Sequence, residues 1–203
     1  LDGKTDVADG HLALNTGTLN LKNGIIKTTS DAGTYNQSAG TLNVTGSSLI
    51  INDANSQISG GNVNLAESGE LILANSKDNT ANLNSTNGRF GITNKSTYTA
   101  TGGTIDKDSV VTIETNSRLK VNGENAEINL TKNDSTLGHI EVNSGNLYIS
   151  DDLTKVTTDN GTFVQTGGNT TITKSTLELN DANSQISGGN IALKEGSTLT
   201  FSP

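Results

Sequence analysis

The two histidines are the side chains of this chain best able to do chemistry, and they occupy matching positions that lie far apart in the sequence. Only two histidines are present, and His11 lies 128 positions before His139. Each follows a glycine directly, so we interpret both as one structural position that recurs in two copies of a repeat. A catalytic pair would need both imidazoles in one site, which this arrangement does not predict.

Two pairs of carboxylates are candidates for glycoside cleavage, because that chemistry uses two acidic side chains that flank the scissile bond. Asp106 and Asp108 would share one face of an extended segment, and Asp151 directly precedes Asp152. The chain has only two arginines, and its aromatic residues are three Tyr and three Phe without Trp. Neither acidic pair therefore has the cationic and aromatic partners of a sugar-cleaving groove. We predict no catalytic residue, no metal, no cofactor and no enzymatic activity.

The segment NDANSQISGGN occurs twice, at residues 52–62 and 180–190. Its alternating Asp, Asn and Gln invite comparison with a calcium loop. It lacks, however, the glycine at the sixth position and the glutamate at the twelfth position of an EF-hand. We interpret it as a turn closed by Asn and Asp side chains. The segment is also a candidate binding turn, and its candidate contact residues are Asp53, Asn55, Gln57, Asp181, Asn183 and Gln185.

These residues belong to a long internal repeat. Residues 10–75 align with residues 138–203 without a gap, and 29 of the 66 aligned pairs are identical. A repeat without gaps is typical of an array in which each unit buries its apolar face against its neighbours. Residues 1–203 are therefore expected to form one segment of a larger solenoid.

A shorter period lies inside the long one. A small residue and a glycine recur before a strand-like alternation, as in TGTLNL, AGTLNV, GGNVNL and SGNLYI. From Gly17 to Gly189 there are 172 residues in eight intervals, a mean of 21.5. The glycines that we take as anchors of this period are Gly17, Gly40, Gly61, Gly88, Gly103, Gly123, Gly145, Gly168 and Gly189. Two intervals deviate, 27 residues before Gly88 and 15 after it, and they predict an irregular coil with a longer loop there.

After most anchors, apolar residues alternate with polar ones, which indicates short strands with one buried face. The inward side chains are predicted to be Leu19, Leu21, Leu49, Ile51, Val63, Leu65, Leu71, Leu73, Leu147, Ile149, Leu177, Leu179, Ile191, Leu193 and Leu199. Such a pattern predicts an all-β chain, a right-handed parallel β-helix (β-solenoid) of about nine coils. An antiparallel sandwich also has many short strands, but it does not predict glycines in a near-constant register.

The composition fits a narrow solenoid. Hydrophobic residues make up 31% of the chain, which is thin for a globular core but sufficient for a few inward side chains in each coil. Disorder is disfavoured because a disordered chain would not maintain an alternating buried face. We count 27 Asn, and Asn at equivalent positions of successive coils can form hydrogen-bonded ladders.

Charge and cysteine content restrict the partners. The net charge is −8, so nucleic acid, which needs a basic surface, is not an expected partner. No apolar run approaches the ~18 residues of a membrane-spanning helix, so direct membrane insertion is not expected. The absence of Cys means that the fold needs no disulfide.

The phrases AGTLNVTGSSLIINDANSQISGGNVNL and GGNTTITKSTLELNDANSQISGGNIAL resemble the passenger-domain repeats of Gram-negative autotransporter adhesins of the self-associating and diffuse-adherence type. The resemblance lies in the general character of the repeats and extends over the whole chain. It implies an extracellular stalk, secreted or anchored at the bacterial outer membrane. It transfers no functional residue, because these families share no residue-level site. The expected function is structural and adhesive, with a host-cell ligand, a bacterial surface ligand or the protein itself as the partner. The alternatives are a glycan-binding module and a carbohydrate-active β-helix enzyme.

Overall fold

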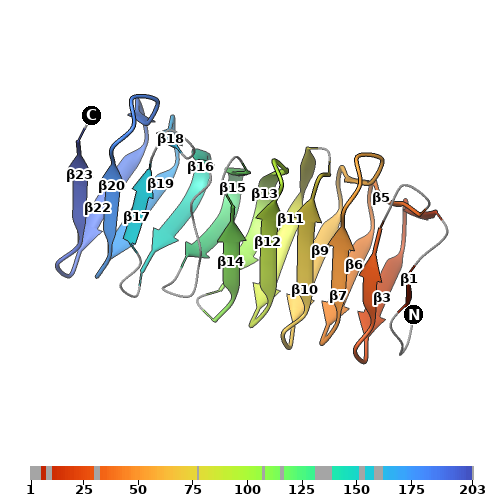
Figure 1. Ribbon diagram of the computed structural model, residues 1–203. Helices are drawn as coiled ribbons and strands as arrows, with labels where there is room; N and C mark the ends of the chain where they lie inside the picture. Colours follow the sequence, from red (N-terminus) through yellow and green to blue (C-terminus); the bar gives the residue numbers. More distant parts are fainter. Residues whose placement is uncertain are drawn as a thin grey trace.

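A computed structural model describes residues 6–7, 11–29, 33–76, 78–106, 108–114, 117–130, 139–150, 154–157 and 162–202. These residues form 23 β-strands and no helix, and every strand pair among them is parallel. The strands stack along one axis (Figure 1). The predicted parallel β-solenoid is therefore confirmed, and the antiparallel sandwich is excluded. Within the described ranges, no helix is long and apolar enough to span a membrane.

Each turn of the solenoid contains up to three strands. Equivalent strands of successive turns stack on one another, and we call the three stacks walls 1, 2 and 3. Wall 1 contains β2 (Leu12–Leu14), β5 (Tyr35–Gln37), β8 (Gln57–Ile58), β18 (Phe163–Gln165) and β21 (Gln185–Ile186). Wall 2 contains β3 (Thr18–Lys22), β6 (Thr41–Thr45), β9 (Asn62–Ala66), β19 (Asn169–Thr173) and β22 (Asn190–Lys194).

In the middle of the molecule, walls 1 and 2 join into long strands. These are β11 (Asn79–Thr86), β13 (Thr97–Ile105), β15 (Arg118–Leu130) and β16 (His139–Ile149). Register shifts between these strands mark where the chain passes from wall 1 to wall 2. Five residue steps separate Val121 from Ala126 in β15, but only three separate their partners Ala100 and Gly103 in β13. The two extra residues of β15 form a bulge.

Wall 3 completes each turn. It contains β1 (Asp6–Val7), β4 (Ile26–Thr28), β7 (Ser48–Ile51), β10 (Glu70–Ala74), β12 (Arg89–Thr93), β14 (Val110–Ile113), β17 (Thr154–Thr157), β20 (Thr176–Leu179) and β23 (Thr198–Phe201). Nine strands stack in wall 2 when the long strands are included, so the described part has about eight turns, roughly 21 residues apart.

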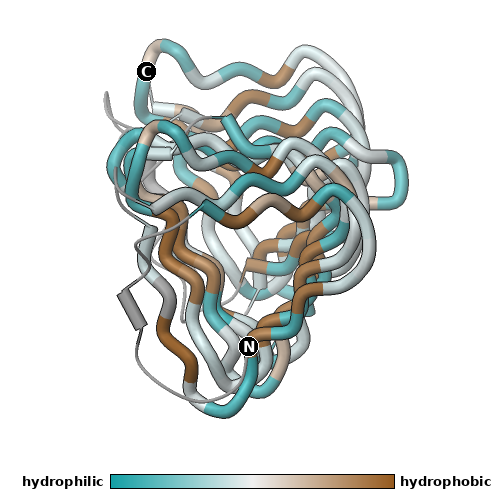
Figure 2. The backbone as a smooth tube through the Cα atoms, turned by 90° about the vertical axis from the view of Figure 1, so that its right-hand side faces the viewer, coloured by the Kyte–Doolittle hydropathy of each residue, from teal (hydrophilic) through white to brown (hydrophobic). Residues whose placement is uncertain are grey.

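The core is a narrow column of apolar side chains inside the three walls. Figure 2 shows the backbone of the stacked turns almost along their axis, with the hydrophobic positions in brown. Of the predicted inward residues, the following are buried: Leu21, Leu49, Ile51, Val63, Leu65, Leu71, Leu73, Leu147, Ile149, Leu177 and Leu179. Four others lie in the first or last turns, where only one side is covered. Leu19, Ile191 and Leu199 are half-buried there, and Leu193 is 50% exposed.

The glycine register is correct except at Gly88 and Gly123. Ala126, rather than Gly123, pairs with Gly103. The carbonyl of Gly88 accepts a hydrogen bond from the N–H of Val110, and that of Gly69 accepts one from Arg89, so both glycines precede wall 3 rather than wall 2. In wall 2, Asn62 pairs with Asn82, and Asn82 pairs with Gly102, at a regular 20-residue spacing. The anchor at Gly88 and the longer loop predicted before it are therefore wrong, although the register does shift once nearby, between Ala81 and Asn82, where β11 pairs with β13. The chain crosses that corner inside β11, where no left-handed residue is required.

Contacts recur at the offset of the long repeat. Gln37 Nε2 donates to the carbonyl of Asn62 at 3.1 Å, and Gln165 Nε2 donates to the carbonyl of Asn190 at 3.1 Å. Ser56 and Ser184 likewise accept hydrogen bonds from the backbone N–H groups of equivalent residues, at 2.9 and 3.0 Å. Equivalent residues therefore make equivalent contacts six turns apart.

Candidate functional site

The two copies of the candidate binding turn lie between walls 3 and 1, and their aspartates are structural. Asp53 is 3% exposed, and its Oδ1 accepts hydrogen bonds from the N–H groups of Asn55 and Ser56 at 2.8 and 2.7 Å. Its Oδ2 accepts the Ser56 hydroxyl at 2.6 Å. In the second copy, Oδ1 of the 6% exposed Asp181 accepts from the N–H of Asn183 at 2.9 Å. The aspartates close the turn and present no free carboxylate to solvent.

Hydrogen bonding also sets the charge state of Asp53. Burial raises the pKa of this carboxyl group, but hydrogen bonds from the Ser56 and Thr29 hydroxyls and from two backbone N–H groups outweigh burial. The pKa of Asp53 therefore lies below its usual range. The group is an anion at neutral pH, held entirely by protein donors.

The amide side chains of the same turns are the parts that face solvent. Asn55, Asn183 and Gln185 are exposed. Gln57 is half-buried, and its Nε2 donates to the carbonyl of Asp78 at 2.9 Å in the next turn. Of the six predicted contact residues, the structure therefore leaves mainly these amides available to a partner.

The other chemically capable residues are not brought together as an active site. Nδ1 of His11 lies 2.8 Å from the Thr34 hydroxyl, and Nδ1 of His139 lies 2.9 Å from the equivalent Thr162 hydroxyl. Asp106 Oδ1 closes a local turn by accepting from the Ser109 hydroxyl at 2.7 Å. The Asp151–Asp152 pair lies outside the described residues. No three His, Cys, Asp or Glu side chains cluster as metal ligands within the described part of the chain.

Instead, a continuous row of polar side chains runs along the outside of wall 2. We call it the amide column, and its members on successive strands are Asn20, Asn43, Asn64, Asn84, Thr104, Glu127, Asn146, Asn169 and Asn190. The strand alternation that turns their neighbours into the core turns these residues outward. All are exposed or half-buried.

Hydrogen bonds join most of the column into ladders. Between turns, Nδ2 of one Asn donates to Oδ1 of the Asn below it, at 2.8 Å for Asn43 to Asn20 and 2.7 Å for Asn64 to Asn43. The same bond recurs at 2.9 Å for Asn169 to Asn146 and 3.0 Å for Asn190 to Asn169. The predicted Asn ladders are confirmed. They hold the amides in a fixed array, so a partner would meet ordered rather than mobile side chains.

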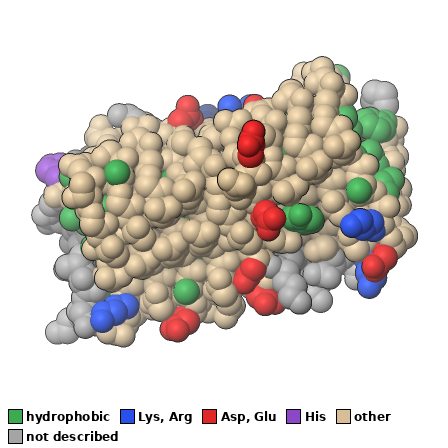
Figure 3. Space-filling model, turned by 180° about the vertical axis from the view of Figure 1, so that it is seen from behind, with side chains coloured by type: hydrophobic (Ala, Val, Ile, Leu, Met, Phe, Trp, Pro, Cys, Tyr) green, Lys and Arg blue, Asp and Glu red, His purple; other side chains and the backbone are tan. Residues whose placement is uncertain are grey.

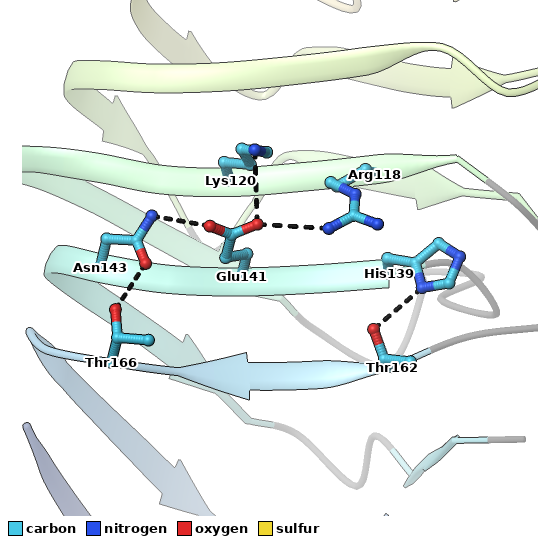
Figure 4. Close-up of polar contacts among 7 residues, drawn as sticks. All are labelled: Arg118, Lys120, His139, Glu141, Asn143, Thr162 and Thr166. Atoms are coloured by element: carbon cyan, nitrogen blue, oxygen red, sulfur yellow. Dashed lines mark hydrogen bonds and ion pairs between the residues drawn. The ribbon is translucent and has the colours of Figure 1, made fainter. Parts of the chain in front are cut away.

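One charged cluster interrupts the uncharged surface, on β15 and β16 (Figure 4). Glu141 Oε2 lies 3.3 Å from Nη1 of Arg118 and 3.4 Å from Nζ of Lys120, and its Oε1 accepts from Nδ2 of Asn143 at 2.9 Å. Partial burial raises the pKa of Glu141, but Asn143 and the two cations outweigh it, so the pKa lies below its usual range. Both cations are already paired with Glu141, and exposed pairs of this kind contribute little stability. Away from such clusters, uncharged polar atoms dominate the rear face in Figure 3.

Comparison with known proteins does not assign the chain to a family. No protein-family model, no curated protein and no solved structure matches the chain.

Proposed function

We propose that this chain is a structural and adhesive segment of an extracellular bacterial protein, a rigid rod whose repeated polar surface attaches to a cell or to another rod. The amide column carries this proposal. In two runs, from Asn20 to Asn84 and from Asn146 to Asn190, it repeats one amide donor–acceptor pair at the ~4.8 Å spacing of adjacent strands, and ladders hold these runs rigid. Many weak contacts repeated along a rod produce strong attachment by avidity.

Two further features support an adhesive rather than a catalytic role. The described carboxylates that could act on a substrate, such as Asp53 and Asp106, are engaged by local donors. The repeated phrases also resemble those of autotransporter adhesins, which favours a location at the cell surface.

A glycan-binding module is the second candidate. Ordered amides and hydroxyls are suitable partners for sugar hydroxyl groups, and the amide column offers them on eight of nine successive strands, the ninth carrying Glu127. A carbohydrate-active enzyme is less favoured, because the two described carboxylates that line one hollow, Glu70 and Glu114, do not form a free pair: Glu70 is engaged by Arg89 and by the Ser48 hydroxyl.

The test is attachment of the purified chain, immobilised on beads, to bacterial cells, to epithelial cells and to beads coated with the same chain. A turn variant replaces Asn55, Gln57, Asn183 and Gln185 by Ser and keeps both structural aspartates. Attachment of the wild type with at least a tenfold loss in the turn variant would assign contacts to the turns. Unchanged attachment of this variant would exclude the turns and leave the amide column.

The enzymatic alternative is tested by incubating the chain with plant and bacterial polysaccharides and measuring new reducing ends. We expect no release above a heat-unfolded control. Cleavage by the folded chain alone would overturn the adhesive proposal.

A further inference from the structure

Gly91 is a glycine without a structural reason. It lies in the middle of β12, where a glycine weakens a strand because it has no side chain to pack and loses more entropy on folding. Every other glycine described between Gly40 and Gly189 has a positive φ or would bring a Cβ within 3 Å of another atom. Gly91 has neither property, since a Cβ there would meet only Ile72, at 3.4 Å or more.

The missing side chain leaves a depression on the outside of wall 3. Gly91 pairs with Ile72 of β10 on one side and with Thr112 of β14 on the other. Strand alternation places all three on the outer face, where Ile72 and Thr112 are half-buried and Gly91 between them is buried. The surrounding outward side chains therefore form a ring around a position with no side chain. The resulting hollow has a volume of about 190 Å³. That is below the ~300–1,000 Å³ of pockets for drug-sized ligands, so it is suited to a single small ring.

The ring around the hollow combines a flat apolar part with a polar rim. Ile72 and Val110 line it with aliphatic carbon, and the Gly91 backbone forms its floor. Thr93 and Thr112 add hydroxyl groups on the same face.

Charged groups complete the rim. Nε of Arg89 lies 3.4 Å from Oε1 of Glu70, and the Ser48 hydroxyl donates to Oε2 of Glu70 at 2.9 Å. The Arg89 side chain is 59% exposed, so a ligand in the hollow can reach its guanidinium N–H donors. Glu114, which is exposed, adds a second carboxylate to the lining.

The geometry points to a subsite for one pyranose unit of an uncharged glycan, with a C–H face of the sugar on Ile72 and Val110, above the buried Gly91. The sugar hydroxyls would exchange hydrogen bonds with Glu70, Arg89 and Glu114. A peptide strand is disfavoured because β12 is already paired on both sides, by β10 and β14, and has no open edge for a further strand. This inference deepens the adhesive function proposed above, since it names the ligand class at one site.

The test is a titration of the isotopically labelled chain with the methyl glycosides of N-acetylglucosamine and galactose, observed by amide NMR. We expect saturable shift changes at Gly91, Thr93 and Thr112 with at least one of these sugars. Methyl glucuronide and N-acetyl-leucine amide represent the anionic and peptide alternatives. Shifts produced only by either of these two probes, or no saturable shift with any probe, would overturn the inference.

Gly91→Val fills the hollow with a residue that suits an outward strand position. We expect this variant to keep its circular dichroism spectrum, to unfold at the wild-type midpoint or a higher one, and to bind the sugar at least tenfold more weakly in the same NMR titration. Thr171→Val, on the outside of β19 in wall 2, is the matched control and should bind like the wild type. Equal sugar binding by Gly91→Val would contradict the subsite.

Bead attachment, measured with the same variants, separates this inference from the general function. Sugar shifts without attachment of the wild-type chain would retain the subsite and reject the adhesive role. Attachment without sugar shifts would reject the subsite and retain the adhesive role.

Discussion

Tyr35 lies in the core beside a buried amide. Its hydroxyl donates to Oε1 of Gln37 at 2.7 Å, and Leu42, five residues after Gln37, is fully buried. The amide group therefore has a partner for its oxygen as well as for its nitrogen.

In the second long repeat the same amide finds a different partner. Phe163 replaces the tyrosine and has no hydroxyl, but Thr170 replaces the leucine, and its hydroxyl donates to Oε1 of Gln165 at 2.8 Å. The two substitutions are thus coupled through a buried oxygen atom.

This coupling predicts the outcome of a double-mutant cycle. Tyr35→Phe should destabilise the chain by about 1–3 kcal/mol, because it leaves Oε1 of Gln37 buried without a donor. Leu42→Thr should be less harmful in the Tyr35→Phe background than in the wild type, because the new hydroxyl can donate to Gln37. Urea unfolding of the four proteins measures the coupling, and strictly additive free energies would contradict this explanation.

Asp53 predicts a specific dependence of stability on pH. Its folded-state pKa is below the unfolded value of about 3.9, so the stabilisation it contributes is complete above that value and is lost as pH falls through the folded pKa. Free energies of unfolding measured from pH 6 to pH 2 should decline less steeply below about pH 4 in Asp53→Asn than in the wild type. Parallel curves for the two proteins would show that the turn does not depend on the carboxylate.

At the scale of the element, the corners between walls 1 and 2 depend on stacked glycines. Gly17 and Gly61 both have positive φ, at 77° and 85°. A Cβ on Gly61 would lie 2.5 Å from the carbonyl oxygen of Gly40, whereas nothing lies within 4 Å of a Cβ on Gly17. The same substitution therefore has different consequences at two equivalent corners.

We expect Gly17→Ala to cost about 1 kcal/mol, from backbone strain alone. Gly61→Ala should destabilise the chain substantially more, because the backbone at Gly40 in the preceding turn must also move. Thermal and urea unfolding of the two variants provide the comparison. Equal losses would mean that contact between stacked corners is unimportant.

The same corners show how far the sequence predicts the fold. Alternation and the glycine period are sufficient to predict parallel strands, inward residues and Asn ladders, because each depends on local pattern and repetition. Gly88 was assigned to the wrong corner, because the glycine before wall 3 has the same sequence surroundings as one before wall 2. The Gln37 and Gln165 hydrogen bonds, the depression over Gly91 and the Glu141 cluster were not predicted. They depend on which residues of neighbouring turns become adjacent, and one sequence does not provide that register.

At the scale of the whole molecule, a solenoid transmits damage only to neighbouring turns. Leu71→Ala should cost about 2–5 kcal/mol, because Leu71 is fully buried. Leu193→Ala should cost less than Leu71→Ala, since Leu193 is 50% exposed. Hydrogen exchange should show lost protection in β7, β10 and β12 for Leu71→Ala. Uniform loss of protection along the solenoid would contradict an array of locally stabilised turns.

The proposed function also belongs to the whole molecule, because the amide column extends through every turn of wall 2. Asn→Thr is a suitable change there, since Thr favours an outward strand position and keeps a polar group. Thr176→Ser, Thr198→Ser and Thr200→Ser, on wall 3, together form the matched control.

The most direct test of the central claim is bead attachment as the column is altered step by step: Asn64→Thr, then Asn64→Thr with Asn84→Thr, then both with Asn43→Thr. Attachment by many weak contacts predicts a graded loss, with each added substitution reducing the retained beads further and the wall 3 control unchanged. Full attachment by the triple variant, with its fold intact, would contradict the claim that the amide column is the adhesive surface.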